Sequence, residues 1–366
     1  MKIFHIVEYF GLGGLENGVV NLINQSNPDR FSHEICCIKR SGKSKDRLNF
    51  KIPIFVMNKR DSNDWKTIIR LVKLIRKQRP DIVHTRNWGT SDGILAARLA
   101  GVRKVVHSEH GWSMSDPTGK NVRRKIVRRV FSIGVSKFVA VSEDMGRWLH
   151  EDIGIRRKKI QVIINGVDIH KFTPAIRNVA KNRLRLNGDV IIGTVARLDP
   201  IKRHDILLKA FSEAIEEYPN ARLLVIGDGP EKQKLEKIWQ NLPNQNQIMF
   251  LGERLDIPQL YQSMDVFALA SQNEGISNTI LEAMASGLPV IATSVGGNRE
   301  VVTPYKTGLL VPPVNVEALK NAILYYIENP EEREKHGKNA RIDAVKRFSL
   351  EKMSKKYESL YASLVV

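Results

Sequence analysis

The stretch ASQNEGISNTILEAMASG occupies residues 270–287 of the chain. It begins at the end of an apolar run, Val266–Ala270, which predicts a buried strand, and its second half predicts a helix over Thr279–Ser286. Another apolar run, Val290–Thr293, follows soon after. A strand, a helix and a second strand in succession are typical of a parallel βαβ unit, because parallel strands need a crossover connection between them.

The same alternation extends outward from this stretch over the whole chain. Near-continuous apolar strands favour parallel sheets that helices cover on both faces. We therefore predict an α/β protein with two doubly wound domains, whose boundary lies near Asn165–Asp189. The expected strands are Ile3–Tyr9, His33–Ile38, Ile82–His84, Val105–Ser108, Phe138–Ser142, Ile160–Ile164, Ile191–Ala196, Ala221–Ile226, Ile248–Leu251, Val266–Ala270, Val290–Thr293 and Gly308–Val311. The expected helices include Trp65–Gln78, Asp205–Glu217, Thr279–Ser286 and Val316–Asn329.

Length and composition agree with this class. The chain has 366 residues, of which 42% are hydrophobic and 27% charged, as in a globular protein of about two domains. No stretch approaches the ~20 apolar residues that a membrane-spanning helix needs. The N-terminus, MKIFHIVEYFGLGG, predicts a strand and a glycine turn rather than a signal peptide. The two cysteines, Cys36 and Cys37, form no disulfide framework, so we expect a cytoplasmic protein.

Positive charge is concentrated in the first half of the chain. Residues 1–164 hold 32 Lys and Arg against 15 Asp and Glu, a net charge of +17, whereas residues 165–366 hold 26 against 24, a net charge of +2. Such asymmetry indicates an anionic partner for the first half: nucleic acid, a membrane surface or an acidic substrate. Nucleic acid is disfavoured because no nucleic-acid-binding motif accompanies the charge.

The segment Lys120–Lys137, KNVRRKIVRRVFSIGVSK, contains seven basic residues and no acidic one. Its apolar residues recur at roughly helical spacing, which predicts a basic amphipathic helix on an anionic bilayer. The membrane contacts would include Arg123, Arg124, Arg128 and Arg129. The alternative is a domain helix that packs its apolar face on the sheet and leaves its basic face in solvent. A phosphorylated ligand, such as a lipopolysaccharide core, also suits this charge.

Residues 270–287 carry the strongest indication of chemistry. A helix that begins at Ser277 or Asn278 presents N–H groups and a positive dipole to an anion. Glu282 lies five residues past Ser277, about 7.5 Å along the axis at ~1.5 Å per residue, roughly the step from a diphosphate to its ribose. A carboxylate can accept hydrogen bonds from both ribose hydroxyls. Glu274 precedes the helix, on the side where a sugar would lie. Taken alone, either glutamate is better explained as a surface residue.

Three further segments follow predicted strands. Arg197 and Lys202 flank the loop after Ile191–Ala196, where two cations can neutralise a diphosphate. The segment GLGGLE (residues 11–16) can bring backbone close to a phosphate or sugar, but it is not the G-x-G-x-x-G of dinucleotide-binding proteins. In HSEHGW (residues 107–112), His110 can hydrogen-bond a substrate hydroxyl or a developing charge. Alone, the two cations are a weak indication, the glycine segment is better explained as a tight turn, and a structural role of the histidine is about as plausible as a functional one.

Several common motifs are absent from the chain. There is no DxD, HExxH, CxxC or GxxxxGK[ST] pattern. The sequence therefore supports neither a dedicated metal site nor P-loop chemistry, and we predict no metal and no cofactor.

In their order along the chain, these segments resemble the retaining glycosyltransferases of group 1, family 4, which have the GT-B architecture. The resemblance covers nearly the whole chain. The Glu-x7-Glu pair at 274 and 282 is specific because ARLDPIK (196–202) precedes it and GLPVIATSVGGNREVV (287–302) follows it. The other matching motifs are GGLE (13–16), SEHG (108–111), AVSE (140–143), INGVD (164–168), IGDGP (226–230) and LGE (251–253).

The resemblance implies two facing Rossmann-like domains with a cleft between them. Residues 1–168 would form an acceptor-side domain, and residues 169–347 would form the domain that binds the nucleotide sugar. Residues 348–366 would cross back to the first domain, with a helix over Phe348–Tyr361.

The resemblance also implies roles for single residues. Glu282 would hold the nucleotide ribose, whereas Arg197 and Lys202 would bind the diphosphate and stabilise the leaving nucleotide. Glu274 and His110 would contact the transferred sugar, and the predicted catalytic residues are these two with Arg197 and Lys202. Further donor contacts would come from Gly14, whose loop closes over the donor, and from backbone groups of Gly275, Ile276, Ser277, Asn278 and Thr279.

Two predictions lie outside this pattern. Arg86, Asn87 and Trp88 follow the strand that ends near His84, and we predict that they contact the acceptor. Arg203 stands where many family members have glycine, which puts the local turn in doubt.

The implied activity is metal-independent sugar transfer from a nucleotide-diphosphate sugar to an acceptor hydroxyl, with retention. Its acceptor would be a lipid-linked or phosphorylated glycan in the assembly of cell-envelope glycan, lipopolysaccharide or exopolysaccharide, at the inner face of the membrane. Two alternatives stay open: a GT-B transferase that makes a soluble glycoside, and a non-catalytic basic protein that binds a membrane or a polyanion. The complete set of donor residues disfavours the second.

Overall fold

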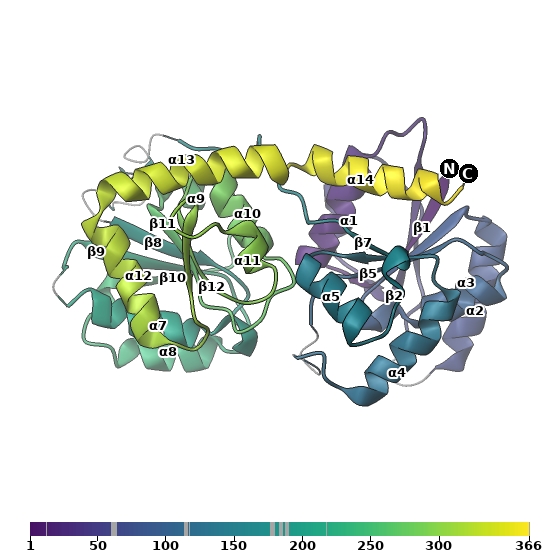
Figure 1. Ribbon diagram of the computed structural model, residues 1–366, viewed down its shortest axis with the longest axis horizontal. Helices are drawn as coiled ribbons and strands as arrows, with labels where there is room; N and C mark the ends of the chain where they lie inside the picture. The colour runs from purple at the N-terminus through teal and green to yellow at the C-terminus, as the bar shows by residue number, and fades with distance from the viewer. Residues whose placement is uncertain are drawn as a thin grey trace. The chain divides into compact units, whose positions relative to one another are not determined.

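The computed structural model describes the whole chain except residues 12, 60–63, 113–115, 117, 176–179, 183–185, 187–189, 217 and 366. The chain forms two compact units, each built on a parallel sheet (Figure 1). The N-terminal unit contains Met1–Gly166 and Leu350–Val366, and the C-terminal unit contains Val167–Ser349. The two parallel sheets confirm the predicted α/β class.

The N-terminal sheet has seven parallel strands in the order β3-β2-β1-β4-β5-β6-β7. They are β1 (Lys2–Phe10), β2 (Ser32–Ser41), β3 (Ile54–Val56), β4 (Ile82–Arg86), β5 (Val105–Glu109), β6 (Lys137–Ala140) and β7 (Ile160–Val162). The prediction missed β3, which is only three residues long. It also extended β6 too far: the strand ends before Ser142, whose hydroxyl accepts a hydrogen bond from the Met145 N–H and caps the next helix.

Helices cover both faces of this sheet. Alternate residues of β1 point to opposite faces, so Phe4 and Ile6 pack on the side of α2, α3 and α5, whereas Ile3 packs with Tyr357 on the side of α14. These helices are α1 (Gly14–Gln25), α2 (Trp65–Gln78), α3 (Asp92–Leu99), α4 (Val122–Phe131), α5 (Glu143–Glu151) and α14 (Leu350–Ser363). The last residues of the chain thus complete the core of the unit that contains the first ones (Figure 1).

The C-terminal sheet has six parallel strands in the order β10-β9-β8-β11-β12-β13. They are β8 (Val190–Val195), β9 (Ala221–Ile226), β10 (Ile248–Gly252), β11 (Val266–Leu269), β12 (Val290–Thr293) and β13 (Gly308–Val311). Its helices include α7 (His204–Ala214), α8 (Lys232–Gln240), α9 (Ile257–Ser263), α10 (Asn278–Ala285), α11 (Asn298–Val301), α12 (Val316–Glu328) and α13 (Pro330–Arg347). All six predicted strands are present, with ends shifted by at most one residue.

The helices named from the sequence were examples and leave out several, among them α13. This helix buries only His336, Gly337, Ala340 and Ala344, so it has no row of large apolar side chains that the sequence would reveal. Among the residues that the structure describes, no helix is long and apolar enough to cross a membrane.

A buried polar network joins α14 to the N-terminal sheet. His84 lies at its centre, with Nδ1 2.7 Å from the Tyr361 hydroxyl of α14 and Nε2 2.6 Å from the Ser108 hydroxyl of β5. His5 extends the network to β2, because its Nε2 lies 2.9 Å from Nδ1 of His33. Burial and the nearby Arg86 guanidinium lower the pKa of His5 and His84 well below the usual value and that of His33 to about 4. The three imidazoles are therefore neutral at pH 7.

We expect stability to fall as the pH decreases from 6.5 towards 4. The unfolded chain binds protons at these histidines in that range and the folded chain does not, so each contributes a loss of about 1.4 kcal/mol per pH unit. Thermal unfolding between pH 7 and 5 would measure the slope. His33→Gln should make the slope shallower, and an unchanged slope in this variant would contradict the assignment.

Candidate active site

Helix α10 begins at Asn278, where the sequence predicted a helix start near Ser277 or Asn278. Ser277 is its N-cap, and the Ser277 hydroxyl accepts a hydrogen bond of 3.4 Å from the Ile280 N–H and lies 3.0 Å from the Thr279 hydroxyl. The first helical residues, Asn278 and Thr279, therefore present their N–H groups away from the helix. Together with Gly275 and Ile276, they form the end of α10 that suits an anion.

Glu274 and Lys202 contact each other beside this helix end. Lys202 Nζ lies 2.5 Å from Glu274 Oε1, and the Ser271 hydroxyl donates to the same oxygen at 2.7 Å. The backbone holds the two loops together, since the Gln272 N–H donates to the Ile201 carbonyl at 2.7 Å. The structure thus brings together two predicted residues that lie 72 positions apart in the chain.

Glu282 is fixed by a residue that the sequence analysis did not identify. The hydroxyl of the fully buried Tyr261, on α9, lies 3.1 Å from Glu282 Oε2 and 3.2 Å from the Thr279 carbonyl. Burial and the Glu282 charge raise the pKa of Tyr261 well above its usual value, so the phenol remains a donor. Tyr261 therefore sets the direction of the Glu282 carboxylate.

Arg197 is exposed after β8, on a loop whose backbone is firmly held. The neighbouring residues Ala196 and Leu198 donate to carbonyls of Ile226 and Asp228, both at 3.0 Å. The doubt about Arg203 is resolved: it adopts the left-handed conformation, with φ +50° and ψ +45°, at the N-cap of α7. Its guanidinium donates two hydrogen bonds of 2.9 Å to Asp205. The turn that glycine would favour is thus kept by arginine.

Two adjacent glycines, Gly296 and Gly297, support the loop before α10. The Gly297 N–H donates to the Gly275 carbonyl at 3.1 Å. Gly296 has a left-handed φ of +45°, and a Cβ atom there would overlap the carbonyl oxygen of Glu274. Only glycine lets the two backbones approach this closely.

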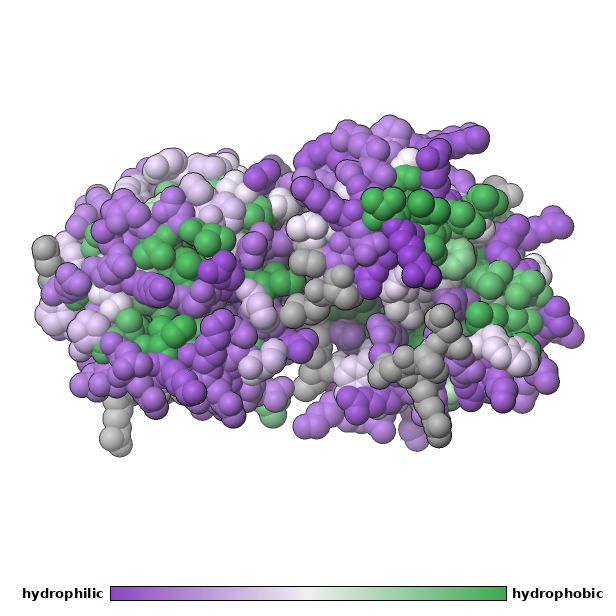
Figure 2. Space-filling view, turned by 90° about the horizontal axis from the view of Figure 1, so that it is seen from below, coloured by the Kyte–Doolittle hydropathy of each residue, from purple (hydrophilic) through white to green (hydrophobic). Residues whose placement is uncertain are grey.

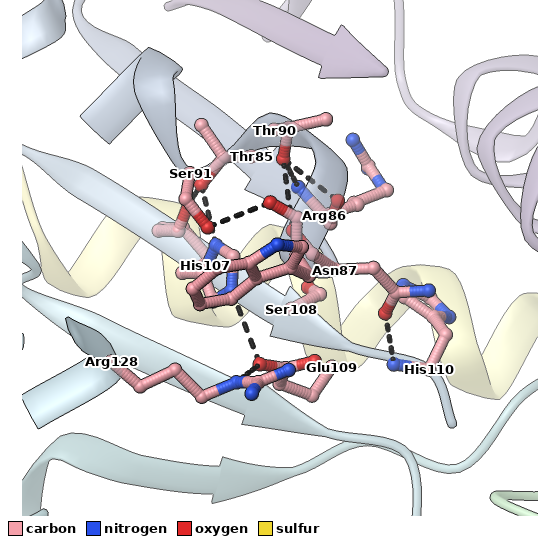
Figure 3. Close-up of polar contacts among 12 residues, drawn as sticks. Thr85, Arg86, Asn87, Thr90, Ser91, His107, Ser108, Glu109, His110 and Arg128 are labelled. Atoms are coloured by element: carbon pink, nitrogen blue, oxygen red, sulfur yellow. Dashed lines mark hydrogen bonds and ion pairs between the residues drawn. The ribbon is translucent and has the colours of Figure 1, made fainter. Parts of the chain in front are cut away.

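In the N-terminal unit, Gly14 begins the helix after β1, and His110 directly follows β5. Gly14 is exposed and begins α1, directly after the N-cap Gly13. The His110 N–H donates to Asn87 Oδ1 at 2.7 Å, and the side-chain Nε2 is buried without a hydrogen-bond partner among the described residues (Figure 3). Burial and the charge of Arg86 lower the pKa of His110 to about 3, so the ring is neutral at pH 7.

The side chains of the three predicted acceptor contacts do not share one environment. Asn87 and Trp88 are only partly buried at the edge of the sheet. Arg86, by contrast, is 3% exposed and turns inward, with Nη2 3.1 Å from His5 Nδ1 and 3.2 Å from His84 Nδ1. The expectation that Arg86 faces the acceptor is therefore wrong for the side chain, which belongs to the core network beneath α14.

The four arginines of α4 do not share one face. Arg123 and Arg129 are exposed, but Arg124 and Arg128 lie over the ring of Trp88, at 5.2 and 5.1 Å from its centre. The prediction of a single basic membrane face is thus wrong for Arg124 and Arg128. The alternative holds only in part: Phe131 packs partly buried against the core, but α4 buries none of its residues fully. Its exposed apolar side chains are Val122 (68%), Ile126 (59%) and Val130 (57%), followed by Ile133 (82%).

Three residues of the site had no clear signal in the sequence. Tyr261 and Ser271 act through single hydroxyl groups, whose partners depend on how the helices and loops pack. Gly296 belongs to the Gly-Gly pair of the motif GLPVIATSVGGNREVV (287–302), which the sequence analysis used only as part of the family resemblance. Among the described residues, no three His, Cys, Asp or Glu side chains form a group that could hold a metal ion.

Two family descriptions match the chain. Residues 12–171 match “Glycosyltransferase Family 4”, and residues 176–343 match “Glycosyl transferases group 1”. The two matches cover most of the N-terminal and the C-terminal unit, respectively.

Individual relatives match along nearly the full length. The UDP-Gal:alpha-D-GlcNAc-diphosphoundecaprenol alpha-1,3-galactosyltransferase of Escherichia coli is 31% identical, over 100% of this chain and 98% of the relative. The N-acetyl-alpha-D-glucosaminyl L-malate synthase of Bacillus anthracis is 28% identical, over 95% and 87%. The fold matches the crystal structure of Anabaena HepE in complex with UDP, with a TM-score of 0.85, 24% identity and coverage of 99% and 100%.

We expect Gly296→Ala to destabilise the protein more than Gly252→Ala. Gly252 has a similar φ of +66° but open space where a Cβ would lie, so it pays only the backbone cost of about 1–2 kcal/mol. Gly296→Ala adds a clash with backbone, which costs about 1–3 kcal/mol more. Calorimetric Tm values of the two variants would measure the difference, and equal shifts would refute the close approach.

Proposed function

Because this chain belongs to the group 1 glycosyltransferases and has the GT-B fold, we propose that it transfers a hexosyl group from a nucleotide-diphosphate sugar with retention and without a metal. The acceptor would be a hydroxyl of a cell-envelope glycan, a lipopolysaccharide or an exopolysaccharide precursor. One observation carries the proposal. In the C-terminal unit, Lys202 contacts Glu274 at the loop before α10, and Tyr261 directs Glu282 on the same helix.

The charges of this cluster suit a leaving nucleoside diphosphate. Negative charge builds on the phosphate as its bond to the sugar breaks. Arg197, Lys202 and the N-terminus of α10 would offset that charge from fixed positions, and this supports the metal-independent reaction. Glu274, which accepts a hydrogen bond from Ser271, holds the Lys202 ammonium in place beforehand, and this reduces the reorganisation that the reaction needs.

We propose that retention comes from a front-face reaction. The bond between the anomeric carbon and the phosphate oxygen breaks, and the acceptor oxygen bonds to the same face of that carbon. The acceptor proton goes to the departing phosphate, so no protein base is needed. His110, which is neutral, would contact hydroxyls of the transferred sugar, and so would Glu274. Gly14 would lie in the loop that closes over the donor.

The donor and acceptor are suggested by the relative in Escherichia coli, whose name gives UDP-Gal and a diphosphoundecaprenol-linked sugar. We propose a UDP-hexose as donor and a polyprenyl-diphosphate-linked sugar as acceptor. The net charge of +17 over residues 1–164 favours an anionic acceptor of this kind.

Helix α4 favours peripheral attachment to the inner face of the membrane. Val122, Ile126, Val130 and Ile133 recur at intervals of three or four residues and are exposed, with Arg123 and Arg129 beside them. Figure 2 shows hydrophobic patches among hydrophilic residues on the N-terminal unit, at the right. An anionic bilayer would bury the apolar side chains and attract the arginines.

Two alternatives differ in what they predict. A soluble acceptor, as in the name of the Bacillus anthracis relative, would leave the exposed face of α4 without a role. A non-catalytic basic protein would not need the contact of Lys202 with Glu274 or that of Tyr261 with Glu282. Turnover of a nucleotide sugar separates the enzyme from such a binding protein.

We expect one class of nucleotide sugar to stabilise the protein against heat. In a panel of UDP-, GDP-, ADP- and TDP-sugars, a UDP-hexose at ~100 times its Kd should add about 2.7 kcal/mol. Glu282→Ala should weaken this effect because it removes the ribose contact, whereas Glu213→Ala, an exposed residue of α7, should not. An unchanged shift in Glu282→Ala would refute the ribose role, and no shift with any donor would favour the non-catalytic alternative.

We expect the protein to sediment with vesicles of phosphatidylcholine and phosphatidylglycerol. Ile126→Asp with Val130→Asp should weaken this binding at least about tenfold, because burying each side chain is worth about 1.5–3 kcal/mol. The matched control is Leu255→Asp, at a 90% exposed position of the C-terminal unit. Equal sedimentation of parent and double variant would exclude this face of α4 as the membrane contact.

A further inference from the structure

Arg128 is a surface-helix residue whose side chain is directed into the N-terminal unit. Its side chain is only 12% exposed, although α4 buries no residue fully. Arg128 Nε donates to Glu109 Oε1 at 2.7 Å, and the guanidinium lies 5.1 Å from the ring centres of both Trp88 and Trp148. Figure 3 shows Arg128 reaching Glu109, at the end of β5.

These contacts belong to a closed series of contacts, here called the circuit. It runs from Arg128 through Glu109, His110, Asn87 and Trp88 back to Arg128. Glu109 precedes His110 in the chain, and Trp88 follows Asn87. The His110 N–H donates to Asn87 Oδ1 at 2.7 Å, and the Asn87 N–H donates to the Ser108 carbonyl at 2.8 Å. Arg128 closes the circuit because it contacts Glu109 on one side and Trp88 on the other.

The circuit holds a strained backbone. Asn87 has φ +53° and ψ 178°, a conformation that residues other than glycine rarely adopt. Such a conformation persists only where the surroundings determine it, and here the supports include the Asn87 side-chain contact and Trp88, whose ring contacts both Arg124 and Arg128.

Simultaneous contact with the rings of Trp88 and Trp148 and with the Glu109 carboxylate requires an arginine at position 128. A guanidinium is planar, so it can contact an indole ring while its edge donates to a carboxylate. Trp148 is itself held, since its Nε1 donates to the Gly119 carbonyl at 3.3 Å and Trp112 packs edge-on at 4.6 Å between ring centres. Lysine would keep the charge but lose the planar contact.

We infer that Arg128 is a positioning residue, which fixes His110 for its contact with the transferred sugar by joining the loop after β4 to the loop after β5. Nothing in the family comparison or in the predicted site assigns this role to α4. The catalytic consequence rests on the proposed function of His110, but the positioning itself does not. The same helix carries the exposed apolar side chains, so α4 would connect the membrane contact with the sugar contact.

Amide hydrogen exchange of the full chain tests the positioning without any ligand. In Arg128→Met, the amides of Asn87 and His110 should exchange at least about tenfold faster, because the circuit is open. Arg128→Lys should lie between this variant and the parent. Arg147→Met is the matched control: an exposed arginine next to Trp148 that pairs with Asp144 at the surface. Equal exchange in Arg128→Met and Arg147→Met would overturn the inference.

Kinetics test the consequence for the reaction. With UDP-galactose as the probe and UDP release as the readout, Arg128→Met should lower kcat at least about tenfold, as misplacement of a substrate contact does. The KM for UDP-galactose should stay within about twofold because the C-terminal unit holds the nucleotide. A loss of thermal stability with kcat unchanged at a temperature where the variant is folded would instead mean a purely structural role.

A double-mutant cycle separates failure of this inference from failure of the proposed function. If Arg128 acts through His110, Arg128→Met should lower kcat less than about twofold in a His110→Ala background. Multiplying effects would overturn the inference while leaving the sugar contact of His110 standing. An unaltered kcat in His110→Ala alone would refute that sugar contact, and the exchange experiment would still decide whether Arg128 positions the loop.

Discussion

Parallel pairing of strands is the constraint on which the candidate residues of each unit depend. In a parallel sheet, all strands end at the same edge, so the loops that follow them meet there although they are far apart in the chain. In the C-terminal unit this brings Lys202, after β8, against Glu274, after β11. In the N-terminal unit it brings Asn87, after β4, to His110, after β5.

Charged groups at these edges are placed by partners that leave them little freedom. Lys202 is held by Glu274, whose carboxylate also accepts from Ser271, and Glu109 is held by Arg128. Burial raises the pKa of Glu109, but hydrogen bonding to His107 and the charge of Arg128 lower it to about 2, so the carboxylate stays ionised. Groups fixed before a substrate arrives need little reorganisation during the reaction, and this is how such sites stabilise developing charge.

The sequence predicted the elements better than the directions of side chains. The end of β11, the N-cap at Ser277 and twelve of the thirteen named strands could be located, because hydrophobic periodicity and capping depend on near neighbours in the chain. The basic helix α4 was located too, but two of its four arginines point inward. Arg86 likewise is a residue type that could bind an anionic acceptor, but its side chain lies in the core.

What the sequence determined by itself is the α/β class, the family and the identity of residues that can carry a charge at a helix end, since these follow from local patterns and motif order. Only the tertiary structure decided that Tyr261 directs Glu282, that Gly296 supports the Glu274 loop and that Arg128 contacts the rings of two tryptophans. The physical reason is that each of these contacts joins separate elements, and its energy comes from burial and geometry that no single segment of the chain contains.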